Sequence, residues 1–219
     1  MKTILCFGDS HTRGNIPGGF DLKTGLSARY DRNKRWPGIL QQELGPQFHV
    51  IEEGIGGRTT NLDELIPGRL YRNGLVQLPV SLEAHYPIDL VILMFGTNDL
   101  KKQFKRSVDD ISNGMRELVK YVRASNKGPA GGAPQAFVVA PAPIVKSGDL
   151  HAEFDERAIK MSHELIESYR QMAEEEQCYF MDSSQIVKAS VVDGVHLDEL
   201  QCFLLGQAIA QKIRTFSHT

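Results

Sequence analysis

The sequence predicts an α/β fold in which helices cover both faces of a parallel sheet. Five short strand-like segments recur along the 219 residues and alternate with longer segments of helical periodicity. Three of these segments are short, almost continuously apolar and rich in β-branched or aromatic residues, as strands buried on both faces are. Polar, glycine-rich turns follow the first three segments, and parallel strands bring such turns to one edge of a sheet.

The first half of the chain is expected to contain three strands and one helix. The first strand is predicted at residues 3–7 (TILCF), directly before GDSHTRG. Residues 15–34 show no clear periodicity but carry several apolar side chains, so they are expected to form an irregular lid or subunit contact. A helix is predicted at residues 35–44, and strands are predicted at residues 48–53 and 88–96.

The second half is expected to complete the sheet and its helices. Helices are predicted at residues 109–125, 153–176 and 198–216, the last capped by Asp198 with Gln201 three residues later. Strands are predicted at residues 135–143 and 178–183. Residues 144–155, which include Phe154, are expected to wall a pocket after the fourth strand. The whole of residues 1–219 is expected to form one domain.

Composition and charge exclude several classes of protein. The chain is 41% hydrophobic, enough for a full core, and its net charge of −2 gives no argument for a nucleic-acid or anionic-membrane partner. No apolar run approaches the roughly 20 residues that a membrane span needs, and the apolar N-terminal run is too short for a signal peptide. Three scattered cysteines favour reduced thiols. We therefore expect a cytoplasmic protein.

Ser10 follows the first predicted strand, where a serine can cap a helix or act as a nucleophile. A nucleophilic serine needs a base within hydrogen-bond reach, and the base needs a third group to orient it. Asp193 and His196 lie three residues apart in DGVH, so both side chains can extend from one turn. His196 alone would more often be a structural histidine, but this spacing favours a base held by Asp193.

Two glycine-rich turns can supply donors for a developing oxyanion. The GIGGRTT turn at residues 54–60 can offer the Gly57 N–H, Ser10 can offer its own N–H, and Asn98 in GTND can offer a side-chain amide. Each turn also has a simpler interpretation. GTND can be an Asx turn or a helix cap, and GIGG can be a tight turn or a phosphate-binding loop. Asn61 occupies the third glycine position of a dinucleotide fingerprint, which argues against that site.

Four short blocks together resemble the signature of the SGNH, or GDSL-type, hydrolases. These blocks are GDS at residues 8–10, Gly57, GTND at residues 96–99 and DGVH at residues 193–196, and they follow the family's order. The resemblance implies a flavodoxin-like three-layer α/β/α sandwich with a five-stranded parallel sheet. It also implies a serine esterase that needs no cofactor.

The resemblance further implies a role for each site residue. Ser10 would be the nucleophile, His196 the base and Asp193 the residue that orients it. The N–H groups of Ser10 and Gly57 and the side chain of Asn98 would form the oxyanion hole. The wider context is similar to the bacterial arylesterase/acyltransferase branch, whose members are homo-oligomers with hydrophobic access channels. A homo-oligomer built from dimers, with an octamer as one form, is therefore expected.

The leading hypothesis is hydrolysis of short-chain aryl or alkyl esters through an acyl-enzyme. The neighbours of the catalytic blocks provide candidate substrate-binding residues, which are His11, Lys101, Phe154 and Val195. Polar side chains at His11, Arg13 and Asn15 replace the apolar and aromatic residues of the similar branch. These polar residues favour water at the entrance of the expected active site, so hydrolysis is expected to exceed acyl transfer.

Parts of the sequence also suggest three other functions. A carbohydrate O-acetyl esterase would use the same catalytic groups, although Trp36 is the single tryptophan available for sugar stacking. A non-catalytic flavodoxin-like module could bind phosphate at GIGGRTT with Arg58 as the counter-charge. A metallohydrolase built on Asp9, His11, Asp193 and His196 is disfavoured, because their spacing matches no regular metal motif. We therefore expect no metal site.

Overall fold

The computed structural model describes residues 1–64, 71–147 and 153–216 and contains a five-stranded parallel sheet. The strands are ordered β4-β1-β5-β6-β7, and each neighbouring pair is parallel. Their bounds are β1 Lys2–Gly8, β4 Phe48–Gly54, β5 Leu90–Met94, β6 Gln135–Ala140 and β7 Tyr179–Asp182. Apart from the hairpin described below, this is the flavodoxin-like order 2-1-3-4-5. The predicted fold class is therefore confirmed.

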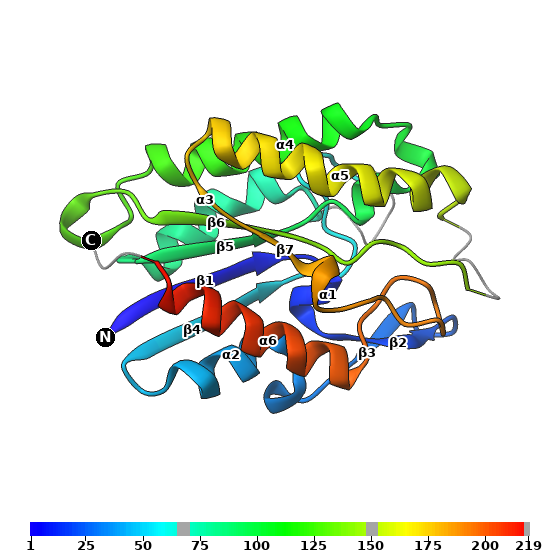
Figure 1. Ribbon diagram of the computed structural model, residues 1–219, viewed down its shortest axis with the longest axis horizontal. Coiled ribbons are helices and arrows are strands. Elements are labelled where there is room, and N and C mark those ends of the chain that lie inside the picture. The colour runs from blue at the N-terminus through cyan, green and yellow to red at the C-terminus, as the bar shows by residue number, and fades with distance from the viewer. Residues whose placement is uncertain (65–70, 148–152, 217–219) are drawn as a thin grey trace.

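Helices form a layer on each face of the sheet (Figure 1). One layer contains α2 (Trp36–Leu44) and α6 (Glu199–Arg214), and the other contains α3 (Gly74–His85), α4 (Val108–Ala124) and α5 (Glu156–Glu175). Side chains alternate along β1, so Ile4 and Cys6 join the core under α2 and α6 while Leu5 and Phe7 join the other core. Helices on both faces explain why the central strands are apolar throughout.

Helix starts follow from local capping. The Asp198 side chain accepts a hydrogen bond from the Gln201 N–H at the start of α6, as the sequence predicts. Ser107 and Asp110 form a capping box at the start of α4. Asp155 caps α5, so this helix begins at Glu156 rather than at the predicted residue 153. Within the described residues no helix has both the length and the apolarity to cross a bilayer.

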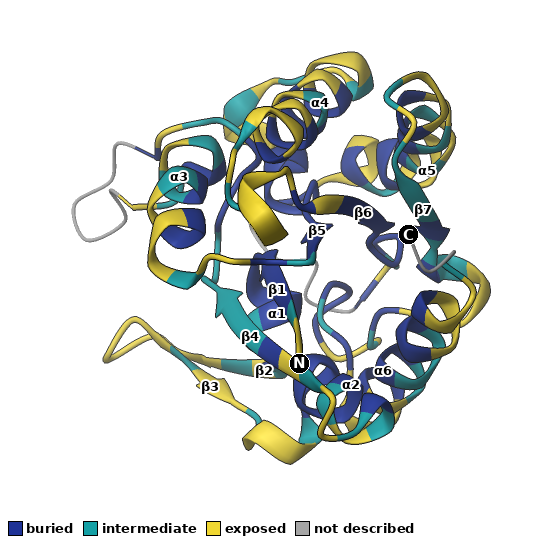
Figure 2. Ribbon diagram, turned by 90° about the vertical axis from the view of Figure 1, so that its left-hand side faces the viewer, coloured by how far each residue is buried: buried dark blue, intermediate teal, exposed yellow. Residues whose placement is uncertain are grey.

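The sequence prediction was wrong for part of residues 15–34, which contain an antiparallel hairpin. It consists of β2 (Asn15–Asp21) and β3 (Leu26–Arg29), and a short 3₁₀ turn at Arg32–Lys34 follows it. The Asp21 side chain accepts from the Lys23 N–H and the Thr24 hydroxyl at the tip, and the nearby Gly25 has a left-handed φ of 69°. Figure 2 shows this hairpin as a largely exposed ribbon outside the layered core. A proline and three glycines in these residues obscured the alternation that would reveal the strands.

The helix α3 was not predicted. It begins at Gly74, contains Pro79 and is capped by Asn73, whose side chain accepts from the Val76 N–H. Glycine and proline are the two weakest helix formers, so the sequence signal was poor. Packing of Leu78 and Leu82 into the core stabilises the helix despite that local cost.

Candidate active site

The short helix α1 (Ser10–Arg13) begins where β1 ends and places Ser10 at the carboxyl edge of the sheet (Figure 1). Asp9 caps this helix, and its Oδ1 accepts from the His11 N–H at 2.9 Å. Gly8 has no room for a side chain, because a Cβ there would lie 2.1 Å from Thr12 Oγ1. The strand therefore turns abruptly into the helix, with Ser10 as its first residue.

His196 and Asp193 come from one tight turn before α6. His196 Nδ1 lies 2.7 Å from Asp193 Oδ2, while Asp193 Oδ1 accepts from the N–H groups of Val195 and His196. Gly194 takes a left-handed φ of 75° that closes this turn. Burial acts to raise the pKa of Asp193, but the hydrogen bonds and charge of His196 and these backbone donors lower it further than burial raises it. Asp193 is therefore held as a carboxylate facing the imidazole.

The structure brings Ser10 and His196 into hydrogen-bond contact. Ser10 Oγ lies 3.0 Å from His196 Nε2, on the opposite side of the ring from Asp193. The hairpin adds a further contact, because the Gly18 N–H donates to Asp193 Oδ2 at 3.0 Å. This last contact could not be predicted from the sequence, because it depends on where the hairpin folds back.

The GIGGRTT turn packs against α1. A Cβ on Gly54 would lie 2.2 Å from the Arg13 nitrogen, so only glycine allows this approach. Gly57 has a φ of 82°, which turns the backbone toward the cavity beside Ser10. Within the described part of the chain, the N–H groups of Ser10 and Gly57 donate to no protein acceptor. Both are available to a bound oxygen atom.

Asn98 begins the 3₁₀ turn after β5 and lines the same cavity as Ser10 and Gly57. Its Nδ2 donates to the Arg58 carbonyl oxygen at 3.1 Å and lies 3.3 Å from Asp9 Oδ2. These contacts fix the amide at the base of the cavity, between the turns that follow β4 and β5. The contact with Asp9 is the longer of the two.

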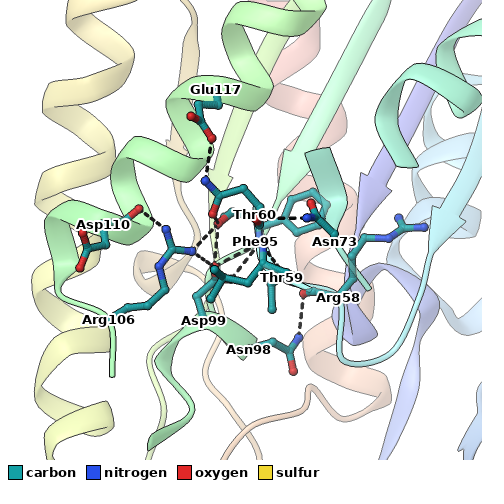
Figure 3. A network of polar contacts seen from close by, with 12 residues as sticks. Arg58, Thr59, Thr60, Asn73, Phe95, Asn98, Asp99, Arg106, Asp110 and Glu117 are labelled. Atoms are coloured by element: carbon teal, nitrogen blue, oxygen red, sulfur yellow. Dashed lines mark hydrogen bonds and ion pairs between the residues drawn. The ribbon is translucent and has the colours of Figure 1, made fainter. Parts of the chain in front are cut away.

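A buried polar network joins these two turns (Figure 3). Asp99 accepts from the Thr60 N–H and from the Thr60 hydroxyl at 2.6 Å, and it pairs with Arg106 at 2.6 Å. Burial raises the pKa of Asp99 to about 6, although Thr60 and Arg106 act in the opposite direction. The network holds the turn that bears Gly57 against the turn that bears Asn98.

The expected place of His11 in the substrate pocket was wrong. Its side chain is fully buried beneath the cavity, with Nδ1 3.1 Å from Asp9 Oδ1 and Nε2 3.0 Å from the Val195 carbonyl oxygen. The ring therefore links the end of β1 to the turn that carries His196. Adjacent residues on a helix lie on different faces, so His11 does not face the same side as Ser10. The His11 side chain points into the core.

Arg58 also differs from its predicted role as a counter-charge for phosphate. Its guanidinium is buried, donates to the carbonyl oxygens of Gly8 and Glu53 and stacks 4.4 Å from the centre of the Phe7 ring. Burial lowers the pKa of this guanidinium to about 10. Arg58 therefore supports the turn from below, and the phosphate-binding interpretation loses its cation.

The four residues of the alternative metal site form two hydrogen-bonded pairs, and the centres of the His11 and His196 rings lie 5.8 Å apart. Asp9 contacts His11, and Asp193 contacts His196. Among the described residues, no group of three or more His, Cys, Asp or Glu side chains is arranged to hold a metal ion.

A cavity of about 360 Å³ surrounds Ser10 and His196. Of the candidate substrate-binding residues, the structure places Lys101, Phe154 and Val195 in its wall. Of the stretch predicted to wall the pocket, residues 148–152 lie outside the described residues. The cavity wall also includes Ile16 and Phe20 from the stretch expected to form a lid or subunit contact, and Ile55 from the GIGGRTT turn. The sequence did not indicate Arg72, which lines the cavity as well.

A serine, histidine and aspartate in line at the carboxyl edge of a parallel sheet are typical of α/β serine hydrolases. The family model of the GDSL-like lipase/acylhydrolase family matches residues 6–200. The chain therefore belongs to this family, which confirms the resemblance found in the sequence.

Solved structures agree with this assignment. The chain is similar to the carbohydrate acetylesterase Est24 from Sinorhizobium meliloti, with 37% identity, a TM-score of 0.89 and coverage of 98% of this chain and 99% of that one. It is also similar to the aryl esterase of M. smegmatis, with 38% identity, a TM-score of 0.89 and the same coverage. The comparison with curated proteins found no match. The family match and the similar esterase structures together identify this protein as an ester hydrolase.

Proposed function

We propose that this protein hydrolyses short-chain acyl esters through a Ser10–His196–Asp193 triad and an acyl-enzyme. The observation that carries the proposal is the continuous chain of contacts from Ser10 Oγ through His196 to Asp193, at 3.0 and 2.7 Å. These contacts supply the base and the orienting group that a serine nucleophile needs. No cofactor takes part in the proposed reaction.

In the first half of the reaction, Ser10 Oγ attacks the ester carbonyl carbon while His196 Nε2 accepts the hydroxyl proton. The resulting imidazolium is stabilised by Asp193, which remains ionised because its pKa is lowered. Negative charge develops on the carbonyl oxygen, where the N–H groups of Ser10 and Gly57 and the amide of Asn98 would donate to it. His196 then returns its proton to the leaving alcohol, and the acyl group stays on Ser10.

In the second half, His196 takes a proton from a water molecule that attacks the acyl carbon. The C–O bond to Ser10 breaks, the proton returns to Ser10 Oγ, and the carboxylic acid leaves. Arg13 and Asn15 line the cavity and favour a hydrated entrance. We therefore propose that hydrolysis exceeds transfer to an added alcohol, which product analysis from vinyl acetate and benzyl alcohol would test. A predominance of benzyl acetate would contradict it.

A fluorophosphonate probe tests the nucleophile directly. We expect covalent labelling of the native protein at Ser10 and none in Ser10→Ala. Ser27→Ala is the matched control, because Ser27 lines the same cavity and lies outside the triad. Failure to label the native protein, or labelling that survives Ser10→Ala, would refute the proposal and favour a non-catalytic binding protein.

We expect the site to take small acyl groups, from acetyl to butyryl. Val195 and Phe154 form apolar wall beside the triad, where each methylene that fits contributes about 0.8 kcal/mol. A methylene that collides costs more than it contributes. Rates on p-nitrophenyl esters of increasing chain length should therefore rise and then fall before octanoate.

Carbohydrate O-acetyl ester hydrolysis is the second candidate, supported by the similarity to a carbohydrate acetylesterase. Acetate release from acetylated xylose or glucose, measured beside p-nitrophenyl acetate, separates the two. A higher kcat/KM on the acetylated sugar would make the sugar ester the better description of the substrate.

A further inference from the structure

Arg13 lies on the same short helix as the proposed nucleophile. It follows Ser10 by three residues in α1, and side chains at this spacing share one face of a helix. Both residues line the active-site cavity. A ligand group bound by Arg13 would therefore lie within a few bonds of an ester held at Ser10.

The hydrogen bonds of Arg13 leave half of its guanidinium free. Nη1 donates to Asn15 Oδ1 at 2.5 Å and to the Ser27 carbonyl oxygen at 3.3 Å. Within the described residues, Nε and Nη2 donate to no protein acceptor, and neither is among the buried polar atoms that lack a partner. Three N–H donors therefore remain accessible beside the cavity.

Arg13 also differs from the other cations of this cavity. Arg72 pairs with Glu64 and Lys101 pairs with Glu153, each at 3.1 Å. In the parts of the chain that the structure describes, Arg13 faces no carboxylate partner.

The other charged groups around Arg13 are either carboxylates that already have partners or cations. Glu52 is engaged by three other arginines, which are Arg29, Arg32 and Arg35. Asp193 also lines the cavity, but its two oxygens are committed to His196 and to backbone donors. Burial, together with the charge of the nearby Arg29, lowers the pKa of Arg13, so its cation lacks local compensation.

We propose that Arg13 forms an anion subsite, and that the preferred ester carries a carboxylate close to the scissile bond. A guanidinium binds a carboxylate through two parallel N–H donors, which Nε and Nη2 offer. Asn15 and Ser27 engage only Nη1, so this donor pair of a cavity-lining residue stays unoccupied by them. This inference rests on the proposed function and identifies the substrate class of the same site.

The carboxylate can belong to either half of the ester, so the experiment has two arms. The acyl arm compares monoethyl succinate with ethyl butyrate, which is neutral and of similar length. The alcohol arm compares 4-acetoxybenzoate with its methyl ester. We expect kcat/KM to favour the anionic ester by about tenfold or more in one arm, the usual scale of a charged hydrogen bond. High salt should reduce the preference.

Substitution of Arg13 tests the assignment through the ratio of the two rates. Arg13→Gln should abolish the preference, and Arg13→Lys should retain part of it because the positive charge remains. Arg32→Gln is the matched control, since Arg32 lies outside the cavity wall and should keep the native ratio. A native enzyme without preference in both arms would overturn the proposal, as would a preference that survives Arg13→Gln.

A binding measurement separates this proposal from the proposed function. Binding of monoethyl succinate and of 4-acetoxybenzoate to Ser10→Ala, measured by calorimetry, needs no turnover. Loss of that binding in Ser10→Ala/Arg13→Gln would support the subsite even if the native protein hydrolysed no ester. No binding of either ester, or equal binding by both variants, would reject the subsite even if the native protein were an active esterase.

Discussion

His11 has two hydrogen-bond partners that can only accept. Asp9 Oδ1 faces Nδ1, and the Val195 carbonyl oxygen faces Nε2. A neutral imidazole can donate from only one of its nitrogens, so both contacts form only when His11 is protonated. Burial acts to lower the pKa of His11, but Asp9, the Val195 carbonyl and Asp193 raise it by more. We therefore expect His11 to hold the turn that bears His196 in its protonated form.

Substitution of His11 should reduce stability in a pH-dependent way. Because the pKa of His11 is raised on folding, its contribution is complete below the ordinary histidine range and is lost as pH rises through the raised value. His11→Gln should therefore cost more stability at pH 6 than at pH 9, as urea unfolding would measure. His49→Gln, at an exposed histidine, is the control variant. An equal cost for His11→Gln at both pH values would contradict a protonated His11.

Substitutions of Ser10 and His196 should have non-additive effects on turnover. Ser10→Ala and His196→Ala should each abolish nearly all turnover, and the double variant should be no worse than either, because each group needs the other. Asn98→Ala should reduce kcat by on the order of 10²–10³, the scale of one oxyanion donor. Steady-state kinetics on a p-nitrophenyl ester would measure all four variants. A change in KM alone would move Asn98 from the oxyanion hole to substrate binding.

At the scale of elements, the turns after β4 and β5 depend on one buried ion pair. Arg106 comes from the segment before α4, yet its guanidinium reaches Asp99 and the Thr60 hydroxyl beneath the catalytic edge. Both partners are shielded from water, with Asp99 fully buried. The pair therefore ties a helix start to the two turns that carry Gly57 and Asn98.

Arg106→Ala should destabilise the protein by about 3–5 kcal/mol, because it leaves the Asp99 carboxylate buried and unpaired. It should also lower kcat, since the two turns lose their common anchor. Arg170→Ala is the control, because Arg170 forms a surface pair with Glu167 and should cost at most about 1 kcal/mol. Chemical denaturation of both variants would check the difference. A similar small loss in both would show that the network adds little.

At the scale of the whole molecule, the hairpin β2–β3 combines two features. Several of its residues line the cavity, and three of its apolar side chains are exposed, Phe20, Leu22 and Leu26, with Leu22 90% exposed. Grouped apolar side chains on a surface commonly mark a contact with another chain. We propose that the hairpin lies at an interface between copies of this protein, close to the mouth of the cavity.

Light scattering should therefore give the mass of a homo-oligomer. Leu22→Asp with Leu26→Asp should shift the mass toward the monomer, because charges would be buried at the interface without partners. Val191→Asp is a control at an exposed apolar residue on another segment. A monomeric mass for the native protein would contradict the proposed assembly.

The sequence determined the sheet, most of its helices and the residues that meet at its edge. Buried parallel strands are recognisable because both of their faces must be apolar, and the chain topology then brings Ser10, Gly57, Asn98 and His196 together. The sequence could not reveal α3, whose Gly74 and Pro79 oppose helix formation locally while its packing favours it.

Only the tertiary structure decided which polar residues face the substrate. His11, Arg13 and Arg58 are all polar neighbours of the catalytic turns, yet two of them are buried supports and Arg13 lines the cavity. The direction of each side chain depends on contacts between segments distant in the sequence, such as His11 with Val195 and Arg13 with Ser27. Residue type and spacing define the chemistry that is available, whereas burial and long-range contacts determine where it acts.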